Sequence, residues 1–250
     1  MGGIAGRAIA VSWKGNTMSI HSTAIIEDGA IIGEDNVIGP YTYIGSQVVI
    51  GDGNHIGPFC TIGKVGQHSS EFYELADNYK HNGVVIGNRN VIREYTSVHY
   101  PLSETTVISD DCYIMAYNHI SHDTVLKNKV ILANNCQIAG YTTIFEGANL
   151  GLSAVIHQYS TIGALAMVGA ASMISRDIPP FSKCFGNPVA SHGLNTVGLV
   201  RKGYSKDQIR LITLAYENRQ LLHLKEDALL LEKYSEYIQK SRRKRLFELV

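Results

Sequence analysis

Aliphatic residues recur at every sixth position along most of this chain. The first run of such positions is unbroken: Ile20, Ile26, Ile32, Ile38, Ile44, Ile50, Ile56 and Ile62. The series resumes at Ile86, and again, after an offset of four residues, it runs from Ile108 to Ile174. Neither the 3.6-residue period of a helix nor the 2.0-residue period of a strand explains this spacing. A six-residue period is typical of a parallel β-helix, in which each hexad supplies a short strand with its aliphatic side chain turned inward.

Glycine often follows the inward residue, as at Gly33, Gly39 and Gly45, and the chain holds 24 glycines in 250 residues. We expect these glycines, with other small or turn-forming residues, to make the corners between strands. The sequence therefore predicts a mainly β fold, a left-handed parallel β-helix of hexapeptide repeats over residues 18–190.

Two segments break the six-residue register. Residues 64–85 hold few aliphatic positions and many polar ones, which predicts a loop excursion from the β-helix. The second break, from Tyr100 to Thr106, inserts four residues. A tolerated surface insertion is one interpretation of both. We favour a functional role for the longer segment, because long loops in compact folds are commonly functional and this one precedes a histidine-rich region.

The two ends of the chain do not continue the six-residue pattern. Residues 1–17 lack the basic start and small-residue cleavage site of a signal peptide, and we interpret them as an extension outside the fold. Residues 191–250 are predicted to form an α-helical C-terminal domain. Ser205 and Gln208 have the spacing of a capping box before a helix, and a second helix is expected over residues 225–239.

Composition narrows the class of protein. The 22 Lys and Arg balance the 22 Asp and Glu, which argues against an electrostatic nucleic-acid binder. No run approaches the roughly 18–20 apolar residues of a membrane span, so no integral membrane segment is expected. The four cysteines are far apart and form no CxxC motif, which favours a reducing, cytoplasmic location over a disulfide scaffold.

Histidines gather in the middle of the repeat, at His99, His119, His122 and His157, and Asp123 directly follows His122. Since Ile120 points inward, its neighbours are expected to point outward, toward solvent or another subunit. A carboxylate can hold an adjacent imidazole in one tautomer and make it a better general base near neutral pH. Ordinary surface or interface histidines are the alternative interpretation.

A zinc site is the competing chemistry, because three histidines can hold a hydratase-type zinc ion. His99, His119 and His122 could supply the ligands, as in the β-helical carbonic anhydrases of the gamma class, but the paired ligands of those enzymes are more widely spaced. We therefore predict no metal. The motifs of P-loop and Rossmann proteins, zinc proteases and serine hydrolases are missing from the sequence.

Several longer fragments are more specific than the hexads. They are Ile86-Gly87-Asn88-Arg89-Asn90, Asn118-His119-Ile120-Ser121-His122-Asp123, Ile131-Leu132-Ala133-Asn134-Asn135, Val155-Ile156-His157-Gln158-Tyr159, Asp177-Ile178-Pro179-Pro180, Gly186-Asn187-Pro188 and Gly198-Leu199-Val200-Arg201-Lys202-Gly203-Tyr204-Ser205. With the repeat and the helical tail, they make the chain from Ser19 onward resemble the bacterial UDP-N-acetylglucosamine O-acyltransferases that begin lipid A synthesis.

The resemblance implies a homotrimer of left-handed β-helices with active sites between adjacent subunits. It implies transfer of a 3-hydroxyacyl group from acyl carrier protein to a hydroxyl, or in some members an amine, of a UDP-sugar, with no cofactor. His122 matches the general base and Asp123 its orienting partner. The backbone N–H of Gly140 matches the donor that stabilises the oxyanion.

The resemblance also assigns the substrate-binding positions. These are Gln67, His68, His99, His119, Tyr141, His157, Gln158, Asn195, Arg201 and Lys202, with Ala170 and Pro188 at the acyl-chain pocket. The sequence departs from the family pattern at some of these positions and near others: Gln67 and His68 lie within an altered Gln-Asp-x-Lys segment, Tyr100 replaces an arginine, Tyr141 a histidine and Val197 an acidic residue. We expect the acyl-transfer residues to be retained and the acceptor selectivity to differ.

Two other functions remain open at this point. One is a coenzyme A-dependent acetyltransferase acting on another small acceptor, and the other is a trimeric β-helix scaffold without catalysis. The helical tail favours an acyltransferase that uses acyl carrier protein as donor, because it matches the domain that faces the carrier protein in this family. With zero net charge, docking of an acidic carrier protein would depend on local basic residues such as Lys202 and Arg242 to Arg245.

Overall fold

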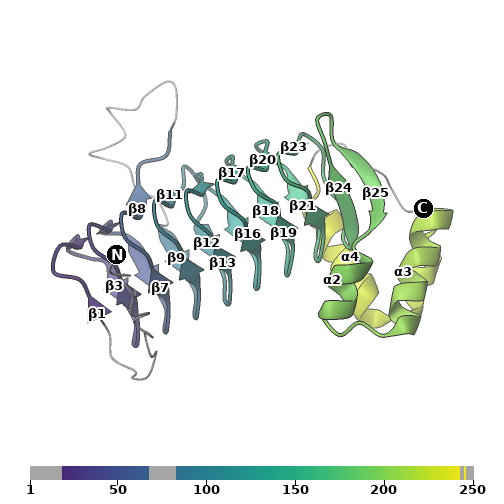
Figure 1. The fold of residues 1–250 in the computed structure, drawn as a ribbon, viewed down its shortest axis with the longest axis horizontal. Coiled ribbons are helices and arrows are strands. Elements are labelled where there is room, and N and C mark those ends of the chain that lie inside the picture. The colour runs from purple at the N-terminus through teal and green to yellow at the C-terminus, as the bar shows by residue number, and fades with distance from the viewer. Residues whose placement is uncertain (1–18, 68–82, 243–244, 246–250) are drawn as a thin grey trace, which may run out of the picture.

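The computed structural model describes residues 19–67, 83–242 and 245. The predicted extension at residues 1–17, His68 and most of the predicted loop at 64–85 lie outside these described residues. The described chain forms a long stack of short strands that ends in a group of helices (Figure 1). Within this part of the chain, no helix is both long enough and apolar enough to cross a lipid bilayer.

The strands form three sheets, which are the three faces of a left-handed parallel β-helix. Sheet A contains β1 (Ser19–Ile20), β4 (Val37–Ile38), β7 (His55–Ile56), β10 (Val91–Ile92), β13 (Tyr113–Ile114), β16 (Ile131–Leu132), β19 (Asn149–Leu150), β22 (Met167–Val168), β24 (Ser182–Phe185) and β25 (Ala190–Leu194). Sheet B contains β2 (Ile25–Ile26), β5 (Tyr43–Ile44), β8 (Thr61–Lys64), β11 (Ser97–His99), β14 (His119–Ile120), β17 (Gln137–Ile138), β20 (Val155–Ile156) and β23 (Met173–Ile174). Sheet C contains β3 (Ile31–Ile32), β6 (Val48–Ile50), β9 (Val84–Ile86), β12 (Thr106–Ile108), β15 (Val125–Leu126), β18 (Thr143–Ile144) and β21 (Thr161–Ile162).

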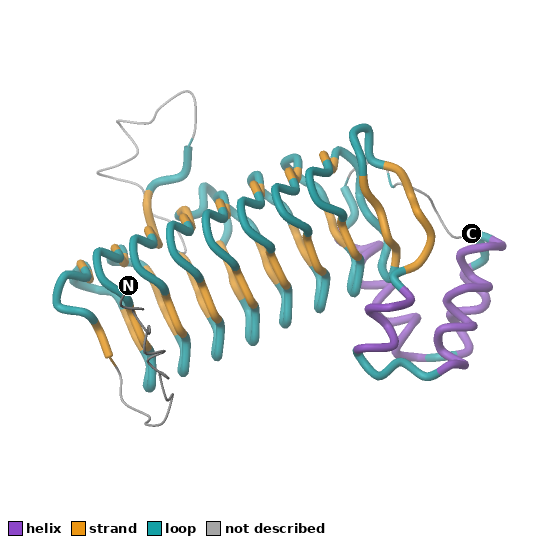
Figure 2. The backbone as a smooth tube through the Cα atoms, in the orientation of Figure 1, coloured by secondary structure: helices purple, strands orange, loops and turns teal. Residues whose placement is uncertain are grey.

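Three strands complete one turn, so from β1 to β23 each strand pairs in parallel with the strands three places away along the chain. A regular turn takes 18 residues, as the hydrogen bond between stacked Asn36 and Asn54 illustrates. The chain bends between faces at three corners, which Figure 2 shows as loops between short strands. We name them the A–B, B–C and C–A corners, after the sheet that the chain leaves and the sheet that it enters.

The six-residue pattern corresponds to one residue in each strand from β1 to β23, whose side chain points to the interior. From Ile38 to Ile174 these side chains are 0–1% exposed and form one continuous core. The first turn differs: Ile20 is 39% exposed, and Ile26 and Ile32 are only partly buried, because no described turn covers that end. The predicted mainly β, left-handed β-helix class is therefore confirmed.

The glycines lie at corners for a different reason from the one expected. The corner residues with positive φ are mostly larger, for example Tyr41, Asp123 and Tyr141. Glycines such as Gly33 are required because turns stack closely: a Cβ there would lie 2.9 Å from the backbone of Gly51 in the next turn. Here glycine permits close approach of two backbones.

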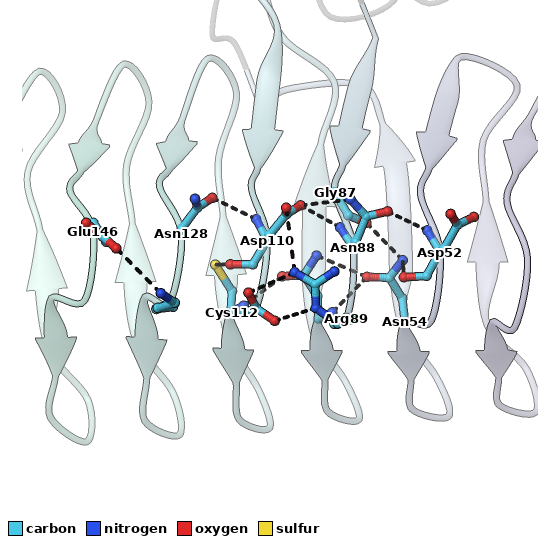
Figure 3. Close-up of polar contacts among 12 residues, drawn as sticks. Asp52, Asn54, Gly87, Asn88, Arg89, Asp110, Cys112, Asn128 and Glu146 are labelled. Atoms are coloured by element: carbon cyan, nitrogen blue, oxygen red, sulfur yellow. Dashed lines mark hydrogen bonds and ion pairs between the residues drawn. The ribbon is translucent and has the colours of Figure 1, made fainter. Parts of the chain in front are cut away.

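Polar side chains stabilise the C–A corner in a ladder (Figure 3). Inside it, the Asn54 side-chain oxygen accepts a 2.9 Å hydrogen bond from the backbone N–H of Asn90, in the next turn. On its outer side, the backbone N–H of Asn88 donates to Asp110 over 2.8 Å. Buried amides whose hydrogen bonds are satisfied by the next turn hold the turns in register.

The C-terminal part differs from the prediction at its start. Residues 190–194, expected to lie at the boundary of the helical domain, form β25, which pairs antiparallel with β24 and closes the end of sheet A. The helices follow as α2 (Thr196–Arg201), α3 (Lys206–Asn218), η1 (Leu221–Glu226) and α4 (Ala228–Lys240). The predicted capping box between Ser205 and Gln208 is present at α3.

The helices pack on the last turns of the β-helix around a second core. It contains Leu165, Phe181, Leu199, Ile212, Ala215, Leu224, Leu230, Tyr234 and Tyr237. Lys233 of α4 forms an ion pair with Glu146 of the C–A corner, with 2.6 Å between nitrogen and oxygen. Thr161 of β21 donates a hydrogen bond to the carbonyl oxygen of Lys240 over 3.1 Å.

Candidate active site

The B–C corner carries the residues singled out for chemistry. His122, Gly140 and Gln158 follow one another at intervals of 18 residues, so they occupy the same corner in three consecutive turns. Backbone hydrogen bonds fix this stacking: Tyr141 N–H donates to His122 O over 3.2 Å, and Tyr159 N–H to Gly140 O over 3.0 Å. Both breaks in the register also fall at this corner, since they separate β8 from β9 and β11 from β12.

His122 and Asp123 form the predicted pair. The His122 Nδ1 atom lies 2.8 Å from Asp123 Oδ2, and the two side chains are 12% and 1% exposed. The sequence predicted that side chains beside Ile120 point outward into solvent or toward a partner. Asp123 instead is buried, because the second break folds over it.

The second break holds the Asp123 carboxylate through backbone N–H groups. Leu102 N–H donates to Oδ2 over 2.8 Å, while the N–H groups of Ser103 and Glu104 donate to Oδ1 over 2.9 and 2.6 Å. The Ser103 hydroxyl adds a 3.1 Å hydrogen bond to Oδ1. Sequence reasoning left this segment without a role. The available signal was its position one turn before His122 at the same corner.

These contacts keep Asp123 charged. Burial by itself would raise the pKa of the carboxyl group. The hydrogen bonds from His122 and from the backbone of Glu104, Leu102 and Ser103 outweigh burial and lower the pKa of Asp123 to about 2. A carboxylate that stays ionised at neutral pH orients an imidazole and stabilises its protonated form.

Gly140 lies against the ring of His122. A Cβ at this position would be 2.3 Å from His122 Cε1 and 2.6 Å from Nε2, so only glycine fits beside the imidazole. Within the described part of the chain, the N–H of Gly140 donates no hydrogen bond. The corner therefore places the backbone of Gly140 directly beside the imidazole ring of His122.

Two further histidines lie next to the pair. His99 is 8% exposed, and its ring meets the ring of His119 edge to face with centroids 4.7 Å apart. Burial, and then the neighbouring His119 and His122, lower the pKa of His99 to about 4. His119 Nδ1 lies 2.8 Å from the Ser97 hydroxyl, and burial followed by His122 lowers the pKa of His119 as well.

The same residues were candidate zinc ligands. Among residues 19–67, 83–242 and 245, no three histidine, cysteine or acidic side chains converge closely enough to hold a metal ion.

Tyrosines form one wall of the corner. The ring of Tyr141 meets His122 edge to face at 5.1 Å and stacks on Tyr159 at 4.7 Å. Beside it, His157 Nδ1 lies 3.2 Å from the carbonyl oxygen of Gln158. A Cβ on Gly66 would lie 3.1 Å from His122 Cβ, so the start of the long loop packs against the histidine as well. Gln67, the last described residue before that loop, is exposed.

The other predicted binding residues lie elsewhere in the same chain. Asn195, Arg201 and Lys202 line a hollow of about 390 Å³ over the outer side of sheet A, together with Asn149 and Lys183. Asn195 also has a structural task that the sequence did not reveal. Its side chain caps α2 by accepting from Gly198 N–H over 3.1 Å and donates to Leu165 O over 2.9 Å.

Ala170 and Pro188 are both exposed. Ala170 lies at the A–B corner after β22, and Pro188 in the turn between β24 and β25. One chain thus places the candidate acyl-pocket residues, the cationic hollow and the histidine corner at different parts of its surface.

A β-helix of hexapeptide repeats with a His-Asp pair at one corner is typical of the hexapeptide-repeat transferases. Residues 29–64 match the sequence profile of the bacterial transferase hexapeptide repeat, and residues 177–245 match domain 2 of UDP-N-acetylglucosamine O-acyltransferase. The chain belongs to the acyl-[acyl-carrier-protein]–UDP-N-acetylglucosamine O-acyltransferase family. The resemblance inferred from its motifs is thereby confirmed, and the protein is an enzyme of the acyltransferase class.

The similarity extends over most of the chain. It is 40% identical over 212 residues to the O-acyltransferase of Paraburkholderia phymatum, covering 79% of this chain and 81% of that one. It is 35% identical over 215 residues to that of Campylobacter concisus, covering 80% and 82%. The structure of UDP-N-acetylglucosamine acyltransferase from Campylobacter jejuni matches with a TM-score of 0.75 at 31% identity, covering 91% of this chain and 98% of that one. LpxA from Acinetobacter baumannii matches with a TM-score of 0.77 at 29% identity, covering 91% and 99%.

Proposed function

We propose that this protein transfers a 3-hydroxyacyl group from acyl carrier protein to UDP-N-acetylglucosamine, the reaction that begins lipid A synthesis. Family membership supports the donor and the acceptor, since the curated relatives carry both in their names. The observation that carries the mechanism is the His122–Asp123 pair beside Gly140. A cytoplasmic location agrees with the four free cysteines, all of which are buried.

His122 acts as the general base. Its Nδ1–H donates to Asp123, so the other ring nitrogen, Nε2, carries the lone pair that accepts a proton from the sugar hydroxyl. As the proton moves to Nε2, the imidazole becomes positively charged, and the ionised Asp123 stabilises that charge. The hydroxyl oxygen then attacks the thioester carbonyl carbon.

Gly140 supports the tetrahedral intermediate. Gly140 lies beside the ring that removes the proton, and its backbone N–H is the donor to the oxygen of the former carbonyl in this mechanism. When the intermediate collapses, the carbon–sulfur bond breaks, and His122 returns its proton to the departing pantetheine sulfur. In this mechanism the acyl group passes directly from the carrier-protein thioester to the sugar hydroxyl, and no side chain of the enzyme is acylated.

We further propose that the enzyme works as a homotrimer. His122 lies at the B–C corner, whereas the hollow containing Arg201 and Lys202 lies over sheet A, a different side of the same chain. A neighbouring copy that turns its sheet A toward this corner would complete the site. The cationic hollow suits the diphosphate of a nucleotide sugar, and guanidinium groups bind phosphate oxygens in a bidentate manner.

The departures from the family pattern give a specific expectation for the acceptor. Tyr141 forms a wall of the corner through its contacts with His122 and Tyr159. A stacked pair of rings there would shape the space open to the sugar, while the proton-transfer pair is unchanged. We therefore propose that acyl transfer is retained and that the preference among UDP-sugars differs from the relatives.

A carrier-protein assay tests this function. Purified protein is incubated with 3-hydroxyacyl carrier protein and a panel of UDP-sugars that includes N-acetylglucosamine and amino sugars, and the free carrier thiol is measured. We expect His122→Ala to lower turnover at least about 10³-fold with the trimer intact, because the base is removed. His21→Ala, at an exposed histidine of the first turn, is the matched control and should retain activity.

The same assay covers the two other candidate functions. Retained turnover in His122→Ala would refute the mechanism. Turnover with acetyl coenzyme A in place of the carrier would assign the protein to a different donor. Failure of every donor and acceptor to react would leave the scaffold interpretation.

A further inference from the structure

One departure from the family pattern has its side chain inside the fold. Tyr100, which stands where the family has an arginine, begins the second break and is only 7% exposed. Its hydroxyl accepts a 3.0 Å hydrogen bond from the backbone N–H of Gln47, which lies two turns back at the same B–C corner. His122 lies at that corner in the following turn. The side chain of Tyr100 therefore leads away from the reacting groups.

Two glycines make room for the ring of Tyr100. A Cβ on Gly45 would lie 2.2 Å from the Tyr100 hydroxyl oxygen, and a Cβ on Gly63 would lie 3.0 Å from ring carbons Cε1 and Cζ. Gly63 also has a φ of +81°, a conformation that residues with a Cβ rarely adopt. Glycine at both positions allows an aromatic ring to reach across one turn into the next. We call the space beside Gly45 and Gly63 the tyrosine slot.

The backbone of Tyr100 is held as well. Its N–H donates to the carbonyl oxygen of Lys64, one turn back, over 2.7 Å. A Cβ on Gly66 would lie 3.2 Å from the Tyr100 carbonyl oxygen and 3.4 Å from Leu102 Cδ2, so the two segments pack closely here. Ring, hydroxyl and backbone together fix the point at which the second break begins.

The donors to Asp123 begin two residues after this fixed point. Pro101, which is buried and whose ring holds φ in a narrow range, separates Tyr100 from Leu102. The N–H groups of residues 102–104 then hold the Asp123 carboxylate, which in turn holds His122. Because few rotatable bonds lie in between, a displacement of Tyr100 is passed on to the donors.

We propose that Tyr100 is a positioning residue for the acyl transfer: its side chain, held in the tyrosine slot, anchors residues 102–104 and so sets the position of the His122–Asp123 pair. The proposal rests on the proposed function and adds a residue whose own side chain leads away from the reacting groups. It assigns this departure from the family pattern to support of the catalytic pair, and not to the choice of acceptor sugar.

The pH dependence of kcat/KM tests this role. Tyr100→Leu removes the ring from the tyrosine slot, so residues 102–104 should move and donate less well to Asp123. A carboxylate with weaker donors is more basic and holds the His122 proton more tightly, so the acid limb should move to higher pH. We expect kcat at neutral pH to fall about tenfold, with KM for the UDP-sugar changed by less than about twofold.

Tyr100→Phe is the conservative variant. It keeps the ring in the tyrosine slot and removes the hydroxyl that accepts from Gln47, so its kcat should lie within about threefold of the unmodified protein. Tyr237→Leu is the control for lost packing, because Tyr237 is a fully buried tyrosine of the second core. It should lower the melting temperature and leave the acid limb in place.

The other titratable side chains around the catalytic pair are the same in all of these variants. His99 and His119 lie on sheet B beside His122, Glu104 belongs to the second break, and the ring of Tyr141 meets His122 from the next turn. A moved acid limb therefore reports a change in the pair itself.

Nuclear magnetic resonance provides a measurement that needs no substrate. The Nδ1–H of His122, which donates to Asp123, should give a low-field proton signal that is missing from His122→Ala. Tyr100→Leu should shift or broaden this signal, because the position of Asp123 changes. Tyr237→Leu should leave it in place.

An acid limb that is the same in Tyr100→Leu and the unmodified protein would overturn the proposal, as would equal movements in Tyr100→Leu and Tyr237→Leu. If Tyr100→Leu does not fold, the His122 signal is compared between Tyr100→Phe and the unmodified protein, where a shift supports the anchor and an unchanged signal refutes it. If the unmodified protein transfers no acyl group, the proposed function fails, and the same signal in Tyr100→Leu decides by itself whether Tyr100 positions the pair.

Discussion

At the scale of single residues, the site depends on close contacts between side chains and backbone groups that belong to adjacent turns. The turns repeat every 18 residues, so a residue at one corner always has a partner in the turns above and below it. His122 therefore meets Gly140, while Asp123 meets the segment from the turn below. Each of these residues is constrained by a backbone far away in the sequence.

Gly140→Ala should displace the base. The added methyl group would lie 2.3 Å from Cε1 of the His122 ring, so the imidazole must move away from its present position. A displacement of about 1 Å at a reacting group can cost on the order of 10²-fold in rate. We expect kcat to fall by that factor or more while the trimer mass and the melting temperature change little. Unchanged kcat would show that Gly140 is not beside the reacting atoms.

At the scale of elements, the four-residue break after β11 has a function that its length does not suggest. It brings three consecutive N–H groups onto one carboxylate, in a concave arrangement typical of anion-binding backbone. The strands cannot supply such donors, because their N–H groups are used between turns. The irregular segment between β11 and β12 is therefore what makes a buried Asp123 possible.

Glu104→Pro tests this arrangement, because it removes the shortest of the three N–H donors while Glu104→Ala retains it. With fewer donors the pKa of Asp123 rises, and the more basic carboxylate holds the His122 proton more tightly. The acid limb of the kcat/KM profile should move to higher pH, with a rate loss of about tenfold at neutral pH. A profile that is the same for both variants would contradict the positioning role of the segment.

At the scale of the whole molecule, two cores meet where the helices dock on the β-helix. The ion pair between Lys233 and Glu146 spans that junction, and the Lys233 side chain is only 13% exposed. Its counterpart Lys129 lies 3.8 Å from the same carboxylate and is exposed. The hydrogen bond and charge of Lys233, and the charges of Lys129 and Lys202, lower the pKa of Glu146, although burial opposes them.

Lys233→Ala should lower the free energy of unfolding by about 1 kcal/mol at neutral pH, and Lys129→Ala by less, because the closer and more buried pair is stronger. A carboxyl group with a lowered pKa stabilises the fold above its unfolded pKa, and this contribution is lost as pH falls. The difference between Lys233→Ala and the unmodified protein should therefore shrink below about pH 4.5, as urea unfolding at several pH values would show. Equal effects of both substitutions would contradict the role of burial.

The residue pattern alone determined the β-helix, its inward aliphatic column, the capping box at Ser205 and the candidate pair of His122 and Asp123. These features are local or periodic, so spacing along the chain is sufficient to find them. Tertiary structure decided the rest. It brought residues 102–104 into contact with Asp123 and Gly140 against the His122 ring. It also placed Arg201 over sheet A, away from the B–C corner that holds His122. Such contacts depend on which turn lies on which, and that is set by stacking in three dimensions and by the two breaks that shift the register.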